Sequence, residues 1–194
     1  MRALYAGEVT MADAWLGRFL ERVEDLGLAE NTLLVVLSDH GACLGEHDAT
    51  GKPYWALYPE LTDTVFMMRH PGGRGAGNRS DYYASTHDVA PTILSMLGIE
   101  NPEQMDGTDL SPIFEGEEPD QRREHFTLGY NDCVWTRDER YAMFSTNTGE
   151  EAKLYDVSED PGMRKNLATK HPETVKRMFD EYVLKDAGGP HPNY

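Results

Sequence analysis

The residues best suited to chemistry lie between positions 38 and 52, which read S-D-H-G-A-C-L-G-E-H-D-A-T-G-K. Asp39 and His40 stand side by side after the apolar run of residues 33–37, and Lys52 follows in a glycine-bounded loop. Carboxylates and imidazoles bind divalent cations, and side chains at the end of a buried strand are well placed to share a ligand. A lysine ammonium stabilises charge on a transferring sulfuryl or phosphoryl group. The segment therefore indicates chemistry on a tetrahedral anion, with Asp39 and His40 on a metal and Lys52 on the anion.

Each of these residues also has a plainer interpretation. Asp39 could serve in a helix cap or turn, His40 could be a buried structural histidine, and Lys52 could be an exposed surface lysine. An oxygen donor such as Asp39 suits hard cations, whereas imidazole is an uncommon calcium ligand, so manganese and zinc stay open beside calcium.

Two further features flank the lysine. His47, in the sequence G-E-H-D, is a candidate proton donor to a leaving group or a structural loop histidine. Tyr54 and Trp55 follow the lysine and could wall a pocket for an aryl or sugar group, although core packing is the simpler expectation.

The elements that position this segment follow an α/β pattern. Apolar residues at spacings of three and four predict a helix over residues 5–26, and Gly27 is a natural stop. Residues 32–37 lack polar alternation, which is typical of a parallel strand with both faces covered. A second short strand is expected at 65–68 and a helix at 88–97. Two parallel strands make a poor sheet by themselves, so we expect partner strands outside this sequence.

After an acidic stretch at residues 100–125, the spacing of apolar residues changes from that of a helix to that of short strands. Asp138-Glu139 predicts a hairpin turn, and a last helix is expected to start near Pro172. Its buried stripe should contain Val175, Met178, Phe179 and Tyr182. Short alternating runs predict strands at 126–130, 133–137, 140–146 and 153–156.

These patterns divide the chain into four parts. Residues 1–99 are expected to form part of a larger α/β core, and residues 100–125 an acidic connecting loop. Residues 126–187 are expected to form a small antiparallel sheet with a helix, and residues 188–194 a loose tail.

The composition limits the partners. The chain carries 18 Lys and Arg against 34 Asp and Glu, a net charge of −16. This balance argues against binding to nucleic acid or to anionic membranes. No apolar run approaches the roughly 18 residues needed to span a bilayer, and no signal peptide opens the sequence. The chain as written is therefore expected in the cytoplasm, although a full-length parent could be exported. Two cysteines, Cys43 and Cys133, cannot make a disulfide framework.

Taken together and in order, several stretches resemble the C-terminal half of sulfatases, which are members of the alkaline-phosphatase superfamily. The resemblance implies an α/β fold, with a partial alkaline-phosphatase-like sheet, flanking helices and a small C-terminal antiparallel α+β subdomain. The matching stretches span nearly the whole chain: 5–17 (Y-A-G-E-V-T-M-A-D-A-W-L-G), 27–37 (G-L-A-E-N-T-L-L-V-V-L), 38–52, 88–98 (D-V-A-P-T-I-L-S-M-L-G), 106–110 (D-G-T-D-L) and 154–167 (L-Y-D-V-S-E-D-P-G-M-R-K-N-L).

The resemblance implies a hydrolase of sulfate esters. In sulfatases the aspartate of this segment and its neighbour ligate a divalent cation, usually calcium, and the lysine contacts the sulfate. That implies metal-ligand roles for Asp39 and His40 and an anion contact for Lys52.

The family's nucleophile is a formylglycine made from the cysteine or serine of a C-x-P-x-R or S-x-P-x-R segment in the N-terminal half. The stretch from Cys133 to Arg137 has the cysteine-to-arginine spacing, but Trp135 stands where proline belongs. We therefore expect this chain to supply two metal ligands and an anion-binding lysine without the nucleophile, and to be inactive or nearly so by itself.

Two other functions stay open. The first is a phosphodiester or phosphonate monoester hydrolase of the same superfamily, and the second is a non-catalytic metal-binding or interaction module. The expected partners are a small sulfate ester or glycan, and either the missing N-terminal half or another subunit.

Overall fold

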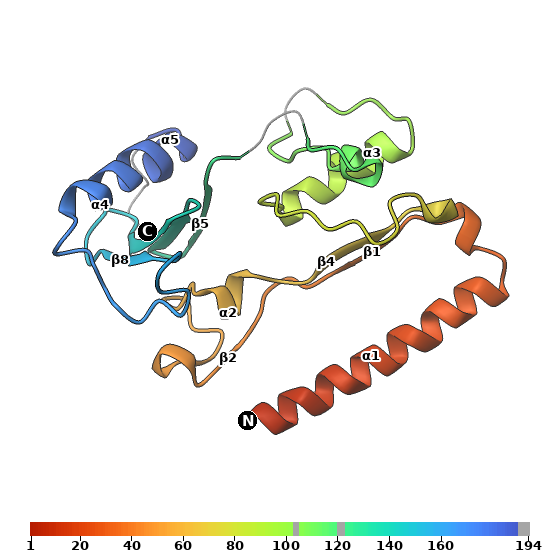
Figure 1. The fold of residues 1–194 in the computed structure, drawn as a ribbon, viewed down its shortest axis with the longest axis horizontal. Helices are drawn as coiled ribbons and strands as arrows, with labels where there is room; N and C mark the ends of the chain where they lie inside the picture. Colours follow the sequence, from red (N-terminus) through yellow and green to blue (C-terminus); the bar gives the residue numbers. More distant parts are fainter. Residues whose placement is uncertain (103–104, 120–122, 190–194) are drawn as a thin grey trace. The chain divides into compact units, whose positions relative to one another are not determined.

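The computed structural model describes residues 1–102, 105–119 and 123–189 (Figure 1). It divides into two compact units, residues 1–51 with 60–121 and residues 52–59 with 122–194. The sequence pattern grouped residues 52–59, here called the strap, with the first part of the chain. In the structure the strap belongs to the second unit, where the buried ring of Tyr58 packs on Phe144 and Tyr155 with centroids 4.6 and 6.4 Å away. The predicted tail lies outside the described residues from position 190 onward.

The first unit opens with the predicted long helix, α1 (Arg2–Asp25). Gly27 ends it with a φ of 68°, as a left-handed glycine commonly does. The apolar residues of α1 have little cover, because no residue of the helix is buried and both Trp15 and Phe19 are mostly exposed. None of the helices in the described ranges is long and apolar enough to cross a membrane.

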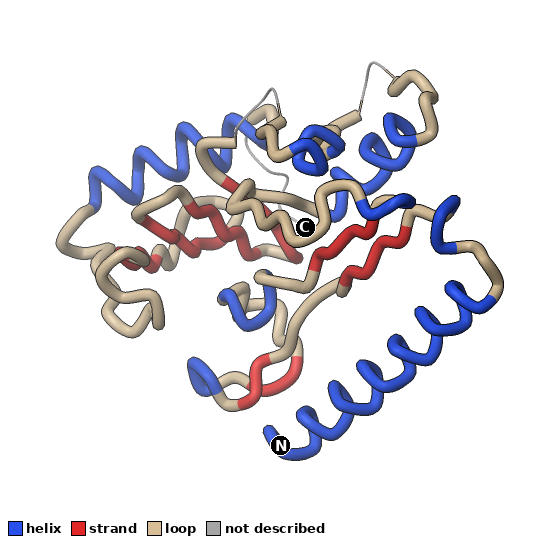
Figure 2. The backbone as a smooth tube through the Cα atoms, turned by 45° about the vertical axis from the view of Figure 1, so that its right-hand side comes forward, coloured by secondary structure: helices blue, strands red, loops and turns tan. Residues whose placement is uncertain are grey.

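The strand after this helix, β1 (Leu34–Leu37), pairs with β4 (Phe66–Arg69), and the pair is antiparallel (Figure 2). The expectation of parallel strands is therefore wrong, and so is the expectation of full cover, since Leu37 and Met67 are largely exposed. An apolar run indicates a strand but carries no information on the direction of its neighbour. The chain between the two strands holds only short elements and turns back on itself, which suits an antiparallel return.

The connection between β1 and β4 contains residues 38–52, the segment with the candidate site residues. It consists of a small antiparallel hairpin, then the strap, then a single helical turn. The bounds are β2 (Cys43–Leu44), the 3₁₀ turn η2 (Glu46–Asp48), β3 (Thr50–Gly51) and α2 (Pro59–Thr62).

The next predicted helix is present as α3 (Val89–Met96), entered through η4 (Thr86–Asp88). The buried Asp88 carboxylate accepts hydrogen bonds from the backbone N–H groups of Ser85 and Thr108, each at 2.7 Å. Thr92 Oγ1 accepts the N–H of Leu110 at 2.9 Å. The D-V-A-P-T and D-G-T-D-L stretches are thus two sides of one hydrogen-bonded structure. The remaining 3₁₀ turns of this unit are η1 (Ala29–Asn31), η3 (Pro71–Gly73) and η5 (Ser111–Glu115).

The second unit contains the predicted antiparallel sheet and helix. The four strands lie in the order β5-β6-β7-β8, and every neighbouring pair is antiparallel. The last helix starts at Pro172 as expected and is interrupted by a π turn. The bounds are β5 (Phe126–Tyr130), β6 (Cys133–Arg137), β7 (Tyr141–Thr146), β8 (Lys153–Asp156), α4 (Pro172–Met178), η6 (Phe179–Val183) and α5 (Leu184–Asp186).

The core of this unit lies between the sheet and the helix. Its fully buried centre includes Met143, Leu154, Met178 and Val183. The predicted stripe is confirmed, because Val175, Phe179 and Tyr182 pack against that centre.

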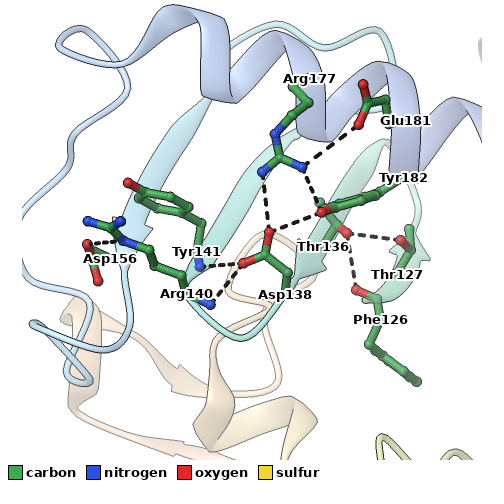
Figure 3. A network of polar contacts seen from close by, with 10 residues as sticks. All are labelled: Phe126, Thr127, Thr136, Asp138, Arg140, Tyr141, Asp156, Arg177, Glu181 and Tyr182. Atoms are coloured by element: carbon green, nitrogen blue, oxygen red, sulfur yellow. Dashed lines mark hydrogen bonds and ion pairs between the residues drawn. The ribbon is translucent and has the colours of Figure 1, made fainter. Parts of the chain in front are cut away.

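A polar network joins the same helix to the predicted β6–β7 turn (Figure 3). Asp138 Oδ1 accepts the N–H groups of Arg140 and Tyr141, which closes the turn. Its other oxygen accepts the hydroxyl of Tyr182 at 3.1 Å and pairs with Arg177 at 3.3 Å. One aspartate therefore holds both the turn and the helix that covers the sheet.

Candidate functional site

Asp39 and His40 lie together where β1 ends. The His40 Nδ1 atom is 2.8 Å from the Gly41 carbonyl oxygen. A carbonyl only accepts, so Nδ1 carries the hydrogen and Nε2 keeps a lone pair in the neutral ring. That Nε2 atom lies 3.4 Å from Asp39 Oδ2, and the Asp39 side chain is 84% exposed. Two electron-pair donors this far apart can both bind one cation at bond lengths of about 2.0–2.6 Å.

The backbone around the pair is fixed from both sides. The Ser38 N–H donates to the Val65 carbonyl at 3.0 Å, and the Ser38 hydroxyl donates to the His40 carbonyl at 2.9 Å. Gly41 lies against α2, where its N–H donates to Leu61 at 2.8 Å. A Cβ at this glycine would be 2.0 Å from the Glu60 carbonyl oxygen, so no larger residue fits. The helical turn α2 is thereby held directly behind the Asp39–His40 pair.

A fuller ligand set is not assembled within this part of the protein. Across residues 1–102, 105–119 and 123–189, no group of three or more His, Cys, Asp or Glu side chains is arranged to hold a metal ion. The donor types and spacing of Asp39 and His40 fit part of a divalent-cation site, with the remaining positions left to other oxygen donors.

His47 lies in the hairpin between β2 and β3. Its Nε2 atom is 3.5 Å from Glu60 Oε2, and both side chains are partly buried. His47 and the following Asp48 both adopt left-handed backbone conformations, with φ of 51° and 57°. Such conformations cost energy in residues other than glycine and need support from their surroundings. The contact with Glu60 favours the structural interpretation of His47.

Two other ionisable groups shape the same hairpin. Glu46 accepts the Leu44 N–H and the Arg2 guanidinium, each at 2.6 Å. The backbone hydrogen bond from Leu44, assisted by the Arg2 charge, lowers the pKa of Glu46. Burial, reinforced by the charges of Glu60 and Glu46, raises the pKa of the Cys43 thiol. Cys43 is therefore a neutral core thiol and a poor nucleophile.

Lys52 directly follows β3 and is the first residue of the strap, in the second unit. Its side chain is exposed, and Nζ lies 5.9 Å from the centre of the Tyr130 ring. Core packing is the wrong expectation for Tyr54 and Trp55, because both are exposed. The structure thus brings Asp39 and His40 together in the first unit, and Lys52 together with an aromatic residue in the second.

Comparison with known proteins identifies the family. The sulfatase family model matches residues 1–99. The chain belongs to the sulfatase family. An ulvan-active sulfatase of Formosa agariphila is 27% identical over 192 residues, which cover 93% of this chain and 37% of that protein.

Solved structures give the same result for the fold. It superposes on BT4656, determined in complex with its substrate D-glucosamine-2-N,6-O-disulfate, with a TM-score of 0.80 and 26% identity. It also superposes on the phosphonate monoester hydrolase of Agrobacterium radiobacter, with a TM-score of 0.83 and 27% identity. The chain spans about two fifths of each of these proteins, since the covered share of each is 40%. The α/β fold with a small C-terminal subdomain is confirmed.

Two residues that contact or lie close to the candidate residues of their own unit carried no signal in the sequence. Glu60 sits in an ordinary P-E-L-T turn and becomes notable only because it lies behind Gly41 and beside His47. Tyr130 reads as the end of a strand, and its closeness to Lys52 depends on the strap folding onto the second unit. The G-Y-N-D sequence of its turn was the available hint that Tyr130 would be exposed.

Proposed function

We propose that this chain forms the cation-binding and anion-binding part of a sulfatase that hydrolyses sulfate esters. The observation that carries the proposal is the 3.4 Å approach of His40 Nε2 to an exposed Asp39 carboxylate, with the other ring nitrogen held by a backbone carbonyl. A histidine oriented in this way presents its lone pair as a metal ligand does. Membership of the sulfatase family supports the same function.

Each residue has a separate task in the proposed reaction. A divalent cation bound by Asp39 and His40, calcium first with manganese or zinc as alternatives, would withdraw charge from the non-bridging oxygens of the ester. Lys52, in the second unit, would donate hydrogen bonds to a sulfate group and stabilise the charge that grows on it. The Gly41 carbonyl keeps the His40 ring in the tautomer that leaves Nε2 free to bind. We leave proton transfer to the leaving group unassigned, because His47 contacts Glu60.

The attacking group is proposed to come from outside these residues. The 194 residues contain no C-x-P-x-R or S-x-P-x-R segment from which a formylglycine nucleophile is made. The rest of a longer sulfatase or a separate subunit would supply it, together with further metal ligands. We therefore expect this chain to bind cation and sulfate ester but to show little or no turnover by itself, because loss of a nucleophile costs many powers of ten in rate.

A phosphonate monoester or phosphodiester hydrolase is the second candidate. The fold similarity to a phosphonate monoester hydrolase favours it, and the same residue types, a carboxylate–imidazole pair and a lysine, suit a phosphoryl group. Both kinds of anion carry one negative charge, but a sulfate monoester has three non-bridging oxygens whereas a phosphonate monoester or phosphodiester has two. Their relative binding therefore discriminates between the candidates.

Binding measurements on the purified 194-residue chain test the proposal. In the presence of calcium, 4-nitrophenyl sulfate should bind more tightly than phenyl phosphonate monoesters. Asp39→Ala should weaken cation binding, and Lys52→Ala should weaken anion binding with little change for the cation. Asp13→Ala and Lys170→Ala, at exposed positions of the first and second units, are the matched controls.

Three results would count against the proposal. Tighter binding of phosphonates would favour the second candidate. Fast turnover of the aryl sulfate by this chain, lost in Asp39→Ala, would show that the chain holds its own nucleophile. If Asp39→Ala still bound the cation and Lys52→Ala still bound the anion, these residues would not form the site, and a non-catalytic module would be favoured.

A further inference from the structure

An exposed aromatic side chain lies beside the anion-binding lysine. Tyr130 is the last residue of β5 and is 46% exposed. The Lys52 ammonium lies 5.9 Å from the centre of its ring, within the range of a cation–π contact. Such a contact uses the electrostatics of the ring face and leaves the N–H groups of the ammonium able to donate to an anion. The two side chains therefore offer one place where a charged group and a ring can bind together.

Lys52 is held in this place by the far end of the strap. Ala56, Leu57 and Tyr58 are all buried, and the Ala56 N–H donates to the Pro53 carbonyl at 3.1 Å. The Tyr58 ring packs against Phe144 of the sheet with a centroid distance of 4.6 Å. The strap that begins at Lys52 is therefore anchored in the core of the second unit, four to six residues further along the chain.

The backbone that carries Tyr130 is held in a tight hairpin turn. It pairs with Cys133 across the β5–β6 hairpin, and Asn131 in the turn takes a left-handed conformation with φ of 55°. The Asn147 N–H donates to the Asp132 carbonyl at 2.7 Å, which ties this turn to the loop after β7. Because the backbone of this turn is already fixed, a ligand that covers the ring has only the side chain of Tyr130 to order.

We propose that Tyr130 is a specificity-determining residue that packs against the ring of a substrate whose sulfate is held by Lys52. The inference rests on the proposed anion-binding role of Lys52. The substrate class is a sulfate ester on a ring, either a pyranose or an aryl group, because both present a flat apolar face to a tyrosine. Tyr54 and Trp55, two and three residues after Lys52 in the strap, are exposed and add aromatic surface to the same segment.

Affinities of the intact chain for three probes test this assignment: inorganic sulfate, 4-nitrophenyl sulfate and glucosamine 6-sulfate. Tyr130→Ala should weaken binding of one or both ring-bearing esters about five- to tenfold. Its affinity for inorganic sulfate should stay within about twofold of the wild-type value. Tyr130→Phe keeps the ring and should bind all three probes as the wild type does. Tyr5→Ala is the matched control, because Tyr5 is similarly exposed at 44% but lies on α1 in the first unit.

The pattern of losses separates this inference from the proposed function. Weaker binding of the aryl ester, the sugar ester or both by Tyr130→Ala supports the assignment and shows which kind of ring is recognised. Equal weakening of all three probes in Tyr130→Ala would overturn it, since Tyr130 would then act only by positioning Lys52. No change for any probe in Tyr130→Ala, while Lys52→Ala abolishes binding, would refute the ring contact and keep the proposed function. No change in Lys52→Ala would refute the proposed function itself.

Discussion

Replacing Asp88 by alanine removes the carboxylate that joins the start of α3 to the D-G-T-D-L loop. Asp88 is fully buried, and its two oxygens accept the Ser85 and Thr108 N–H groups, each at 2.7 Å. A hydrogen bond to a charged group contributes about 1.5–3 kcal/mol, and a buried donor left without a partner costs about 1–3 kcal/mol. Because both donor residues are only part-buried and water can replace some of the loss, we expect Asp88→Ala to cost about 3 kcal/mol in the first unit.

Hydrogen exchange measures this cost in the unit where it arises. A loss of about 3 kcal/mol should speed exchange of the Thr108 and Leu110 amides by a factor of about 10². The amide of Met143, in the second unit, should keep its rate. Asp88→Asn should lose roughly half as much, because one amide oxygen replaces two carboxylate oxygens.

Asp106→Ala is the control for the same loop, because Asp106 is exposed and two residues from Thr108. Its exchange rates should match those of the wild type. Unchanged protection of Thr108 in Asp88→Ala, or equal losses in Asp88→Ala and Asp106→Ala, would contradict the role assigned to this carboxylate.

Three further perturbations follow from the structure. Leu154→Ala, at a fully buried position of the second core, should cost about 2–5 kcal/mol in urea denaturation, and an unchanged midpoint would contradict its place in the core. The Ser158 hydroxyl, which donates to Asp156, lowers the pKa of that carboxyl, so its stabilisation is present above the unfolded value of about 4 and is lost as the pH falls through the lower folded value. Melting temperatures of the wild type and Asp156→Asn should therefore converge in acid, and parallel curves would refute the linkage. Gly41→Ala places a methyl group 2.0 Å from a backbone oxygen and should weaken cation binding, whereas Gly7→Ala has open space and should stabilise α1 by about 1 kcal/mol in thermal melts. If the two glycine variants had the same cation affinity and the same melting temperature, the packing constraint at Gly41, behind Asp39, would be contradicted.

Much of the fold could be predicted from local pattern. The second unit is a chain of short alternating strands joined by turns, and hydrophobic alternation with turn chemistry is enough to locate each strand. Two helices were equally accessible, since α3 is entered through η4, which starts at a capping box, and α4 starts at Pro172. The direction of β1 relative to β4 was not accessible, because an apolar run such as residues 33–37 is compatible with either neighbour.

The candidate site residues also fall into a pair that local sequence predicts and a pair that it does not. Asp39 and His40 are adjacent in the sequence, so their closeness needed no long-range information, although the orientation of the ring depends on Gly41. The pairing of Lys52 with Tyr130 joins positions far apart in the chain. It follows from the packing of Tyr58 on the sheet, which no local spacing encodes.

Paramagnetic broadening by Mn²⁺ in the ¹⁵N-labelled chain tests the cation-binding role of Asp39 and His40 most directly. At low Mn²⁺ the amide signals of residues 38–42 should broaden first, and both Asp39→Ala and His40→Ala should abolish that broadening. Broadening that centres on the acidic residues 100–119 instead, or that persists unchanged in both variants, would contradict the assignment of these two residues as ligands.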